Sequence, residues 1–247
     1  MKDFNAAKEL FKDTIDLFFY FDSINAEIAK EKIEDAIMER NTSLVFIIGD
    51  HGVGKSYILR LINQAISQVQ LTILIEHPFL DKRDLLKILY EAKGLIFDND
   101  VNFNTLKDKL LTAYEGTNHT VFIDEAQLFN EELFELIGIL SDSKVFQFVL
   151  SMRQEESALI LQKKHFKART KIVIEYGNLE SSEILRYIQS LLVRQLHGEI
   201  ASMFTKNEAK IIGRYTKGNF RTIKKFLYVL MKLLAYAKKM VCQNIKK

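Results

Sequence analysis

The amino-acid sequence predicts an α/β protein with a three-layer αβα core around a parallel sheet, followed by a small C-terminal helical domain. Short runs of branched apolar residues alternate with segments whose apolar residues recur at helical spacing. That alternation is typical of a parallel sheet covered by helices on both faces. After residue 176 the helical spacing continues without further strand-like runs, which predicts the helical domain.

The first predicted elements surround a glycine-rich segment. A helix is expected over Asn25–Glu39, behind the capping candidates Asp22 and Ser23. Leu44–Ile48, LVFII, has the length and branched residues of a fully buried strand. A helix over Ser56–Val69 follows, with its apolar residues on one face.

Further strands and helices then alternate along the core. The strands are expected at Leu71–Ile75, Val121–Ile123, Val145–Leu150 and Lys171–Glu175, and the helices at Arg83–Lys93, Leu106–Tyr114, Glu131–Leu140 and Gln154–Gln162. Beyond the core, helices are expected at Ser182–Leu196, Lys206–Tyr215 and Thr222–Met240, the second behind a Thr205-x-x-Glu208 capping box.

Composition and charge limit the class of protein. Apolar residues make up 48% of the 247 residues and charged residues 27%, which is typical of a globular protein. The single cysteine, Cys242, excludes an internal disulfide and favours a reducing compartment. The N-terminal segment has acids before its short apolar stretch, unlike a signal peptide or a membrane span. We therefore expect a soluble, cytoplasmic protein.

The charge is unevenly distributed. Residues 209–247 contain eleven bases and no acid, which leaves residues 1–208 at −8 within a chain of net charge +3. This asymmetry favours a domain boundary and an acidic partner for the C-terminal part. We expect two domains: residues 1–177, with N-terminal helices and the αβα core, and residues 178–247, the helical domain with its basic end.

The segment GDHGVGKS at residues 49–56 matches the phosphate-loop pattern. The glycines let the backbone wrap around phosphate oxygens, Lys55 reaches the β and γ phosphates, and the Ser56 hydroxyl ligates magnesium. A chance match in a glycine-rich turn is the alternative, but the required strand and helix flank the segment. His51 fits a variable loop position. The predicted nucleotide-binding residues are Gly49, Asp50, His51, Gly52, Val53, Gly54, Lys55, Ser56 and Tyr57.

The second motif is the apolar strand that ends in Asp124 and Glu125, within TVFIDEAQLF. After a phosphate loop, this pattern places Asp124 near the metal and Glu125 where it can activate water as a general base. The alternative is a strand end capped by solvated acids. The DEAQ letters also resemble two-domain helicases, a reading that needs a second ATPase-like domain for which this chain has no room.

Three further positions are candidates for contacts with the nucleotide. Ser151 follows a strand and could sense the γ phosphate, or be an ordinary strand-end serine. Arg169, in HFKART, could reach a neighbouring subunit's nucleotide, or be solvated. Arg221, in GNFR, could contact the γ phosphate from the helical domain. The basic C-terminal residues could bind nucleic acid or form a solvated face. Both interpretations stay open because these bases are not confined to one helical stripe.

In their order along the chain these motifs resemble the AAA+ P-loop ATPases, and among them the ExeA/GspA-like ATPases and their transposition-helper relatives. The resemblance runs from about Phe18 to Leu234 and includes GDHGVGKS, VFIDEAQLF, HFKART, NLESSEILRYIQSLL and GNFR. It implies that Ser151 is sensor 1, Arg169 the arginine finger and Arg221 sensor 2. Phe220 stands where such families usually have proline, which weakens the match at the lid turn.

The resemblance implies an ATPase that uses ATP and Mg²⁺ and acts in a homo-oligomer or partner-dependent assembly. It further implies a stand-alone cytoplasmic protein, peripheral to the inner membrane through a partner in secretion-like or DNA-uptake machinery. The main alternative is an ATP-dependent DNA-binding switch in transposition or replication. A kinase-like phosphoryl transferase is a third reading, although Asp124 and Glu125 fit water as the acceptor better.

Overall fold

The computed structural model describes residues 2–14, 17, 19–77 and 79–244, with only the backbone described for residues 242–244. The side chain of Cys242 therefore lies outside the described part. The chain divides into two compact units. The core unit comprises Glu27–His51 and Lys55–Tyr176, and the helical unit comprises Met1–Ala26, Gly52–Gly54 and Gly177–Lys247.

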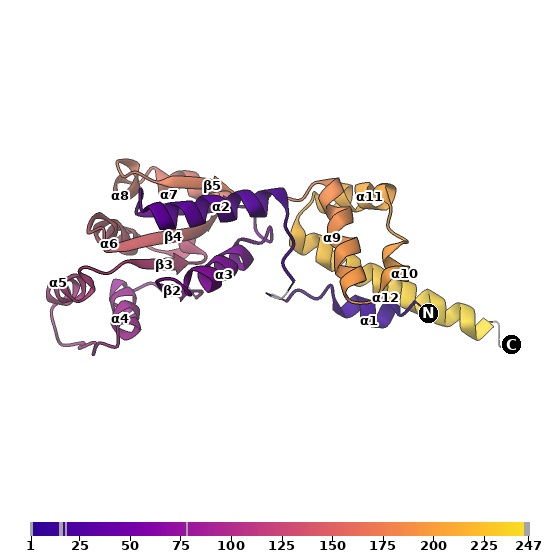
Figure 1. Cartoon of the computed structure of the whole chain (residues 1–247), viewed down its shortest axis with the longest axis horizontal. Coiled ribbons are helices and arrows are strands. Elements are labelled where there is room, and N and C mark those ends of the chain that lie inside the picture. The colour runs from indigo at the N-terminus through magenta and orange to yellow at the C-terminus, as the bar shows by residue number, and fades with distance from the viewer. Residues whose placement is uncertain (1, 15–16, 18, 78, 245–247) are drawn as a thin grey trace. The chain divides into compact units, whose positions relative to one another are not determined.

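The core unit is built on a five-stranded sheet with the order β2-β3-β4-β1-β5 (Figure 1). Every strand pair is parallel. The predicted α/β class with a parallel sheet is thus confirmed. The strands are β1 (Leu44–Gly49), β2 (Leu71–Ile75), β3 (His119–Ile123), β4 (Phe146–Arg153) and β5 (Ile172–Glu175).

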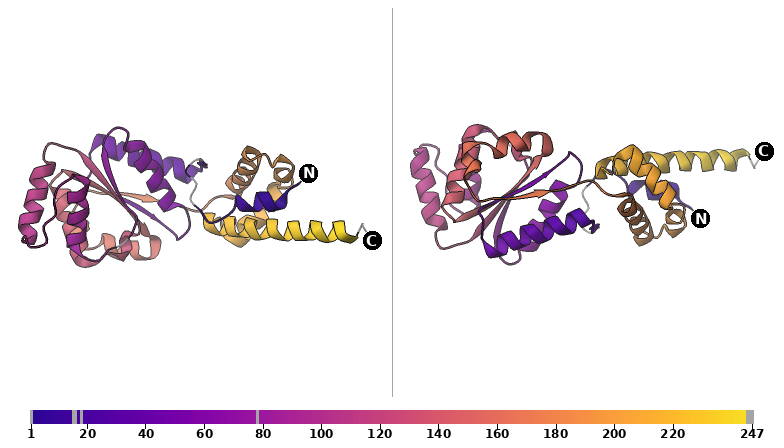
Figure 2. Two further views of the ribbon diagram at one scale, coloured as in Figure 1. Left: turned by 90° about the horizontal axis from the view of Figure 1, so that it is seen from below. Right: turned by 90° about the horizontal axis from the view of Figure 1, so that it is seen from above.

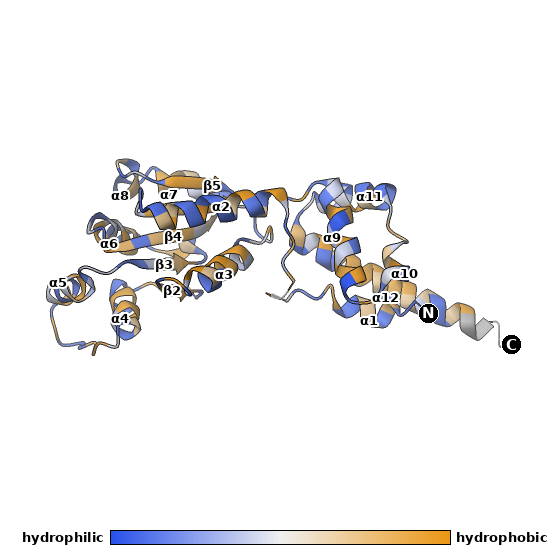
Figure 3. Cartoon of the chain, in the orientation of Figure 1, coloured by the Kyte–Doolittle hydropathy of each residue, from blue (hydrophilic) through white to orange (hydrophobic). Residues whose placement is uncertain are grey.

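Helices cover both faces of this sheet (Figure 2). Figure 3 shows apolar and hydrophilic residues interspersed along α2 and α3. This is the pattern of helices that turn one side toward the protein core. The helices are α2 (Ile24–Glu39), which begins in the helical unit, α3 (Lys55–Ile66), α4 (Lys82–Ala92), α5 (Phe103–Tyr114), α6 (Glu131–Asp142), α7 (Gln154–Leu161) and α8 (Lys164–Lys167).

The central strands are buried on both faces. All six residues of β1 are buried, which explains why its sequence is continuously apolar rather than alternating. Leu44, Phe46 and Ile48 join the main hydrophobic cluster with residues of α4, α5 and α6. Val45 and Ile47 point to the opposite face and are also fully buried. This packing holds the strand ends, and hence the loops that follow them, in fixed positions.

The helical unit has its own hydrophobic cluster. It contains α1 (Phe4–Glu9), α9 (Ser181–Arg194), α10 (Gly198–Ala201), α11 (Lys206–Thr216) and α12 (Phe220–Asn244). The predicted Thr205–Glu208 capping box is present at the start of α11. None of the described helices combines the length and apolar character needed to cross a bilayer.

The N-terminal segment departs from the predicted division at residue 177. Residues 1–26 group with the C-terminal helices and not with the core. The physical reason is a set of long-range contacts: α1 packs against α12, and the buried Glu183 carboxylate accepts the Ile24 amide at 2.8 Å. Sequence periodicity also missed the short helices α1, α8 and α10, which are too brief to show a repeating pattern.

Candidate nucleotide-binding site

The glycine-rich loop connects the end of β1 to the start of α3. Gly49 is the last residue of β1, and Lys55 is the first of α3. Gly52 and Gly54 have φ angles of 84° and 117°, which side chains rarely tolerate. Because the first amide groups of a helix have no partner within the helix, the start of α3 offers donors to an anion held by the loop.

Lys55 is buried at the mouth of the loop, with 5% of its surface exposed. Its ammonium donates to the carbonyl oxygens of Gly49, at 2.8 Å, and Asp50, at 2.9 Å. Burial lowers the pKa of Lys55, while the Glu125 and Asp124 carboxylates act in the opposite direction. A bound phosphate would supply the negative charge that this buried ammonium lacks, so the lysine fits a nucleotide.

Asp124 and Ser151 meet across neighbouring strands. Ile123, the last residue of β3, pairs with Leu150 of β4, which places the following residues, Asp124 and Ser151, side by side. The Ser151 hydroxyl donates a short hydrogen bond to Oδ1 of Asp124. The Glu125 amide donates to the same oxygen at 3.0 Å. Both of these bonds go to Oδ1. The other oxygen, Oδ2, could therefore help to hold Mg²⁺, which in nucleotide sites is bound through one or two carboxylates and phosphate oxygens.

Glu125 is held by two polar side chains that the sequence did not single out. Its Oε2 accepts from Nε2 of Gln127 at 2.5 Å and from Nη2 of Arg153 at 3.1 Å. Its backbone is in the left-handed region, with φ 53°. Arg153 is the last residue of β4, two beyond Ser151, and pairs in register with Gly49. The two-residue spacing along one strand was the available signal for Arg153, because alternate residues share a face.

The other predicted loop residues differ in exposure. Asp50 and His51 are exposed, Val53 is buried, and Ser56 and Tyr57 in the first turn of α3 are half-buried. The predicted metal ligands come from two elements. Ser56 follows Lys55 in α3, and Asp124 follows β3 and directly precedes Glu125, the general-base candidate.

Arg169 is not brought to this site within the same chain. It precedes β5, whose amino end lies at the edge of the sheet opposite the phosphate loop, since β5 runs parallel to β1. Its Nε and Nη2 bind the Asp142 carboxylate at 2.7 and 2.5 Å. This ion pair raises the pKa of Arg169 and lowers that of Asp142.

Arg221 lies in the first turn of α12, in the helical unit. Its Nε forms an ion pair with Asp13 at 3.1 Å. Its amide donates to the carbonyl of Gly52, which groups with the same unit, at 2.9 Å. The described contacts of its side chain thus include a carboxylate of the N-terminal segment.

Known proteins resemble this chain in sequence and in fold. Residues 38–160 match the family described as AAA domain. The chain is 26% identical over 191 residues to general secretion pathway protein A of Aeromonas hydrophila, covering 72% of this chain but only 35% of that protein.

Solved structures share the fold of this chain. Cdc6p from Pyrobaculum aerophilum superimposes with a TM-score of 0.66 at 12% identity, over 94% of this chain and 66% of that one. The Drosophila ORC bound to DNA gives a TM-score of 0.65 at 11% identity, over 95% and 61%. At such identities the likeness shows the fold.

Proposed function

Because the chain is an AAA+ P-loop ATPase that resembles general secretion pathway protein A, we propose that it binds MgATP at residues 49–57 and hydrolyses it to drive a partner assembly. One observation carries the proposal. The buried ammonium of Lys55 and the Asp124–Ser151 pair are brought by the fold to the carboxyl edge of the same sheet, with Glu125 beside them.

The nucleotide is held by the loop and by Lys55. The ammonium is already placed by two loop carbonyls, so binding requires little reorganisation of this side chain. Ser56 and Asp124 would hold Mg²⁺, which when bound neutralises charge on the phosphates. Ser151 orients the Asp124 carboxylate through its hydroxyl. Gly49, Asp50, His51, Gly52, Val53, Gly54 and Tyr57 complete the proposed binding loop.

Glu125 acts as the general base in this proposal. Its carboxylate accepts a proton from the attacking water. In the resting structure Gln127 and Arg153, both bound at Oε2, hold that carboxylate in place. The resting ion pair with Arg153 therefore favours slow hydrolysis in the isolated protein. An activating partner or neighbouring subunit would speed hydrolysis by releasing Glu125.

Two arginines complete the proposed cycle. Arg169 lies at the sheet edge opposite the loop of its own chain, which suits a role toward a neighbouring subunit's nucleotide. Arg221 is proposed to contact the γ phosphate from the helical unit. Both are engaged by carboxylates, Asp142 and Asp13 respectively, so each must exchange an ion pair for a phosphate contact.

The resemblance to general secretion pathway protein A supports an output in secretion-like or DNA-uptake machinery. Because this chain spans about a third of that relative, the partner is part of the proposal and not of the comparison. We propose a cytoplasmic protein that is peripheral to the inner membrane through that partner.

A second candidate function, an ATP-dependent DNA-binding switch, is favoured by the placement of bases in the helical unit. Lys210, Arg214 and Lys217 are exposed at helical spacing on and directly after α11. On α12, Lys225, Lys232 and Lys239 are exposed at intervals of seven residues. Rows of exposed bases attract phosphates and release counterions.

The test is steady-state ATP hydrolysis against protein concentration, with and without duplex and single-stranded DNA. We expect specific activity to rise with concentration in the wild type and to stay low and flat in Arg169→Ala. Glu125→Gln should retain ATP but lose hydrolysis by roughly 10²-fold or more. Wild-type hydrolysis by Glu125→Gln would disprove the base assignment. Stimulation by DNA would favour the second function.

A further inference from the structure

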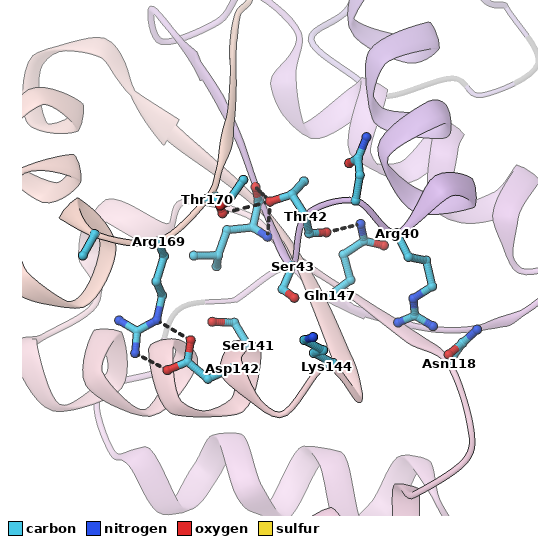
Figure 4. A pocket seen from close by; sticks show the side chains of 13 residues that line it. Arg40, Thr42, Ser43, Asn118, Ser141, Asp142, Lys144, Gln147, Arg169 and Thr170 are labelled. Carbon is cyan, nitrogen blue, oxygen red and sulfur yellow. Dashed lines mark hydrogen bonds and ion pairs between the residues drawn. The ribbon is translucent and has the colours of Figure 1, made fainter.

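A polar cavity of about 640 Å³ opens at the amino edge of the sheet. Leu44, the first residue of β1, lines it, whereas Gly49 at the other end of β1 begins the phosphate loop. The cavity is therefore separate from the nucleotide site, at the opposite edge of the core unit. Figure 4 shows its polar lining, which includes Arg40, Thr42, Asn118, Lys144, Gln147 and Arg169.

The cavity carries more positive than negative charge. Arg40, Lys144 and Arg169 line it together with one acid, Asp142. Both oxygens of Asp142 accept hydrogen bonds from Arg169, Oδ1 from Nε and Oδ2 from Nη2. The charges of Arg40 and Lys144 therefore remain uncompensated by the acid of the cavity. Burial lowers the pKa of Arg40, which a neighbouring anion would reverse.

Two buried polar atoms of the lining have no partner among the described residues. Gln147 is 1% exposed, and its Nε2 donates to the carbonyls of Ala36 and Thr42 at 2.6 and 2.7 Å. These bonds fix the orientation of the amide and leave Oε1 as a buried acceptor without a donor. Nη1 of Arg40 is a buried donor without an acceptor. Buried polar groups are normally paired.

We propose that this cavity binds a phosphate ester that also carries a hydroxyl or amino donor. The phosphate would accept from Arg40 and Lys144, and the donor would bind Oε1 of Gln147. The volume lies within the range of small-molecule sites. Bases at helix C-termini often only complement the helix dipole, and that accounts for the exposed Lys144 after α6. It does not account for the unpaired atoms of Arg40 and Gln147.

The phosphate can come from a free small molecule or from nucleotide bound to a neighbouring copy of this chain. The first source stands independently of the proposed ATPase function. The second rests on that function, because Arg169 lines the same cavity. The two sources predict different behaviour in dilute protein, where neighbours are absent.

The free source is tested by calorimetric titration of ribose 5-phosphate into dilute protein saturated with ADP, which keeps the phosphate loop filled. We expect one site per chain, weakened at least tenfold by Arg40→Gln and by Lys144→Gln. Lys144 is exposed, so its variant should fold even if Arg40→Gln does not. Lys167→Gln, an exposed base of α8 outside the cavity, is the matched control. Ribose without phosphate should not bind.

The neighbour source is tested by sedimentation of Glu125→Gln protein with ATP. If ribose 5-phosphate does not bind, but Lys144→Gln abolishes ATP-dependent association and Lys167→Gln does not, the phosphate belongs to the neighbour. A separate ATP-binding measurement on Glu125→Gln shows whether the proposed function itself has failed. If neither binding nor association depends on Arg40 and Lys144, the cavity holds only water and the proposal is wrong.

Discussion

Nη2 of Arg153 lies 3.1 Å from Oε2 of Glu125, so the residue that ends β4 forms an ion pair with the proposed general base. Gln127 binds the same carboxylate oxygen. Both contacts come from segments adjacent to the Asp124–Ser151 pair, and they define the starting position from which Glu125 must act.

Breaking this ion pair should increase basal hydrolysis. The two side chains are 39% and 24% exposed, and partly exposed pairs contribute about 0.2–1 kcal/mol. Removing the charge in Arg153→Gln should therefore raise kcat by up to about fivefold with KM unchanged. Steady-state kinetics of the purified protein measure this. Lys163→Gln, which removes the Lys163–Glu131 pair elsewhere in the core unit, should leave kcat unchanged. A fall in kcat with a rise in KM would instead place Arg153 on the nucleotide.

His119 should make the protein less stable in mild acid. It is 2% exposed, packs against Tyr114 with ring centroids 4.4 Å apart, and its burial lowers the pKa to about 4. The unfolded imidazole takes up a proton near pH 6.5, so between pH 6.5 and 4 the unfolded state binds more protons. The free energy of unfolding should fall through this window by up to about 3 kcal/mol.

Urea unfolding at pH 7 and pH 5 measures the His119 effect. The pH dependence should shrink in His119→Gln and persist in His77→Gln, because His77 is exposed. An equal pH dependence in wild type and His119→Gln would mean that other groups cause the acid sensitivity.

Glu183 should be a large contributor to the stability of the helical unit. It is 5% exposed, and its two oxygens accept the amides of Ile24 and Glu180 at 2.8 and 2.9 Å. Glu183→Ala leaves both donors without this acceptor and should lower the free energy of unfolding by about 1–3 kcal/mol. Glu183→Gln keeps one acceptor oxygen and should lose less. Denaturant titration checks both, and an unchanged midpoint in Glu183→Ala would refute the assignment.

The basic residues of α12 should separate into two classes. Lys224 is buried and donates to the Thr14 carbonyl at 2.8 Å, so Lys224→Gln should lower the melting temperature. Replacing the exposed Lys225, Lys232 and Lys239 by glutamine should leave the melting temperature unchanged. If the helical unit binds DNA, the triple variant should also reduce the salt dependence of DNA retention. Retention that is unaffected by the triple change would remove these lysines from any DNA surface.

The parts of the proposed site that depend on local chemistry could be predicted from the sequence. A phosphate loop needs glycines, a lysine and a hydroxyl at fixed spacing between one strand and one helix, so residues 49–57 could be predicted as the loop without knowing the rest of the fold. The structure has the expected strand and helix on either side of the glycines. Asp124 and Glu125 were recognisable because an apolar strand precedes them. The buried strands could be placed for the same reason, since continuous apolar runs are a local signal.

Contacts between distant segments were decided by the tertiary structure. Ser151 reaches Asp124, and Arg153 reaches Glu125, only because β3 and β4 are neighbours in register. Arg169 is paired with Asp142 because the end of α6 and the segment before β5 meet at the amino edge of the sheet. The sequence by itself determined the motifs and the α/β class. Strand order, long-range ion pairs and the packing of residues 1–26 depend on burial of surfaces far apart in the chain, which no local pattern encodes.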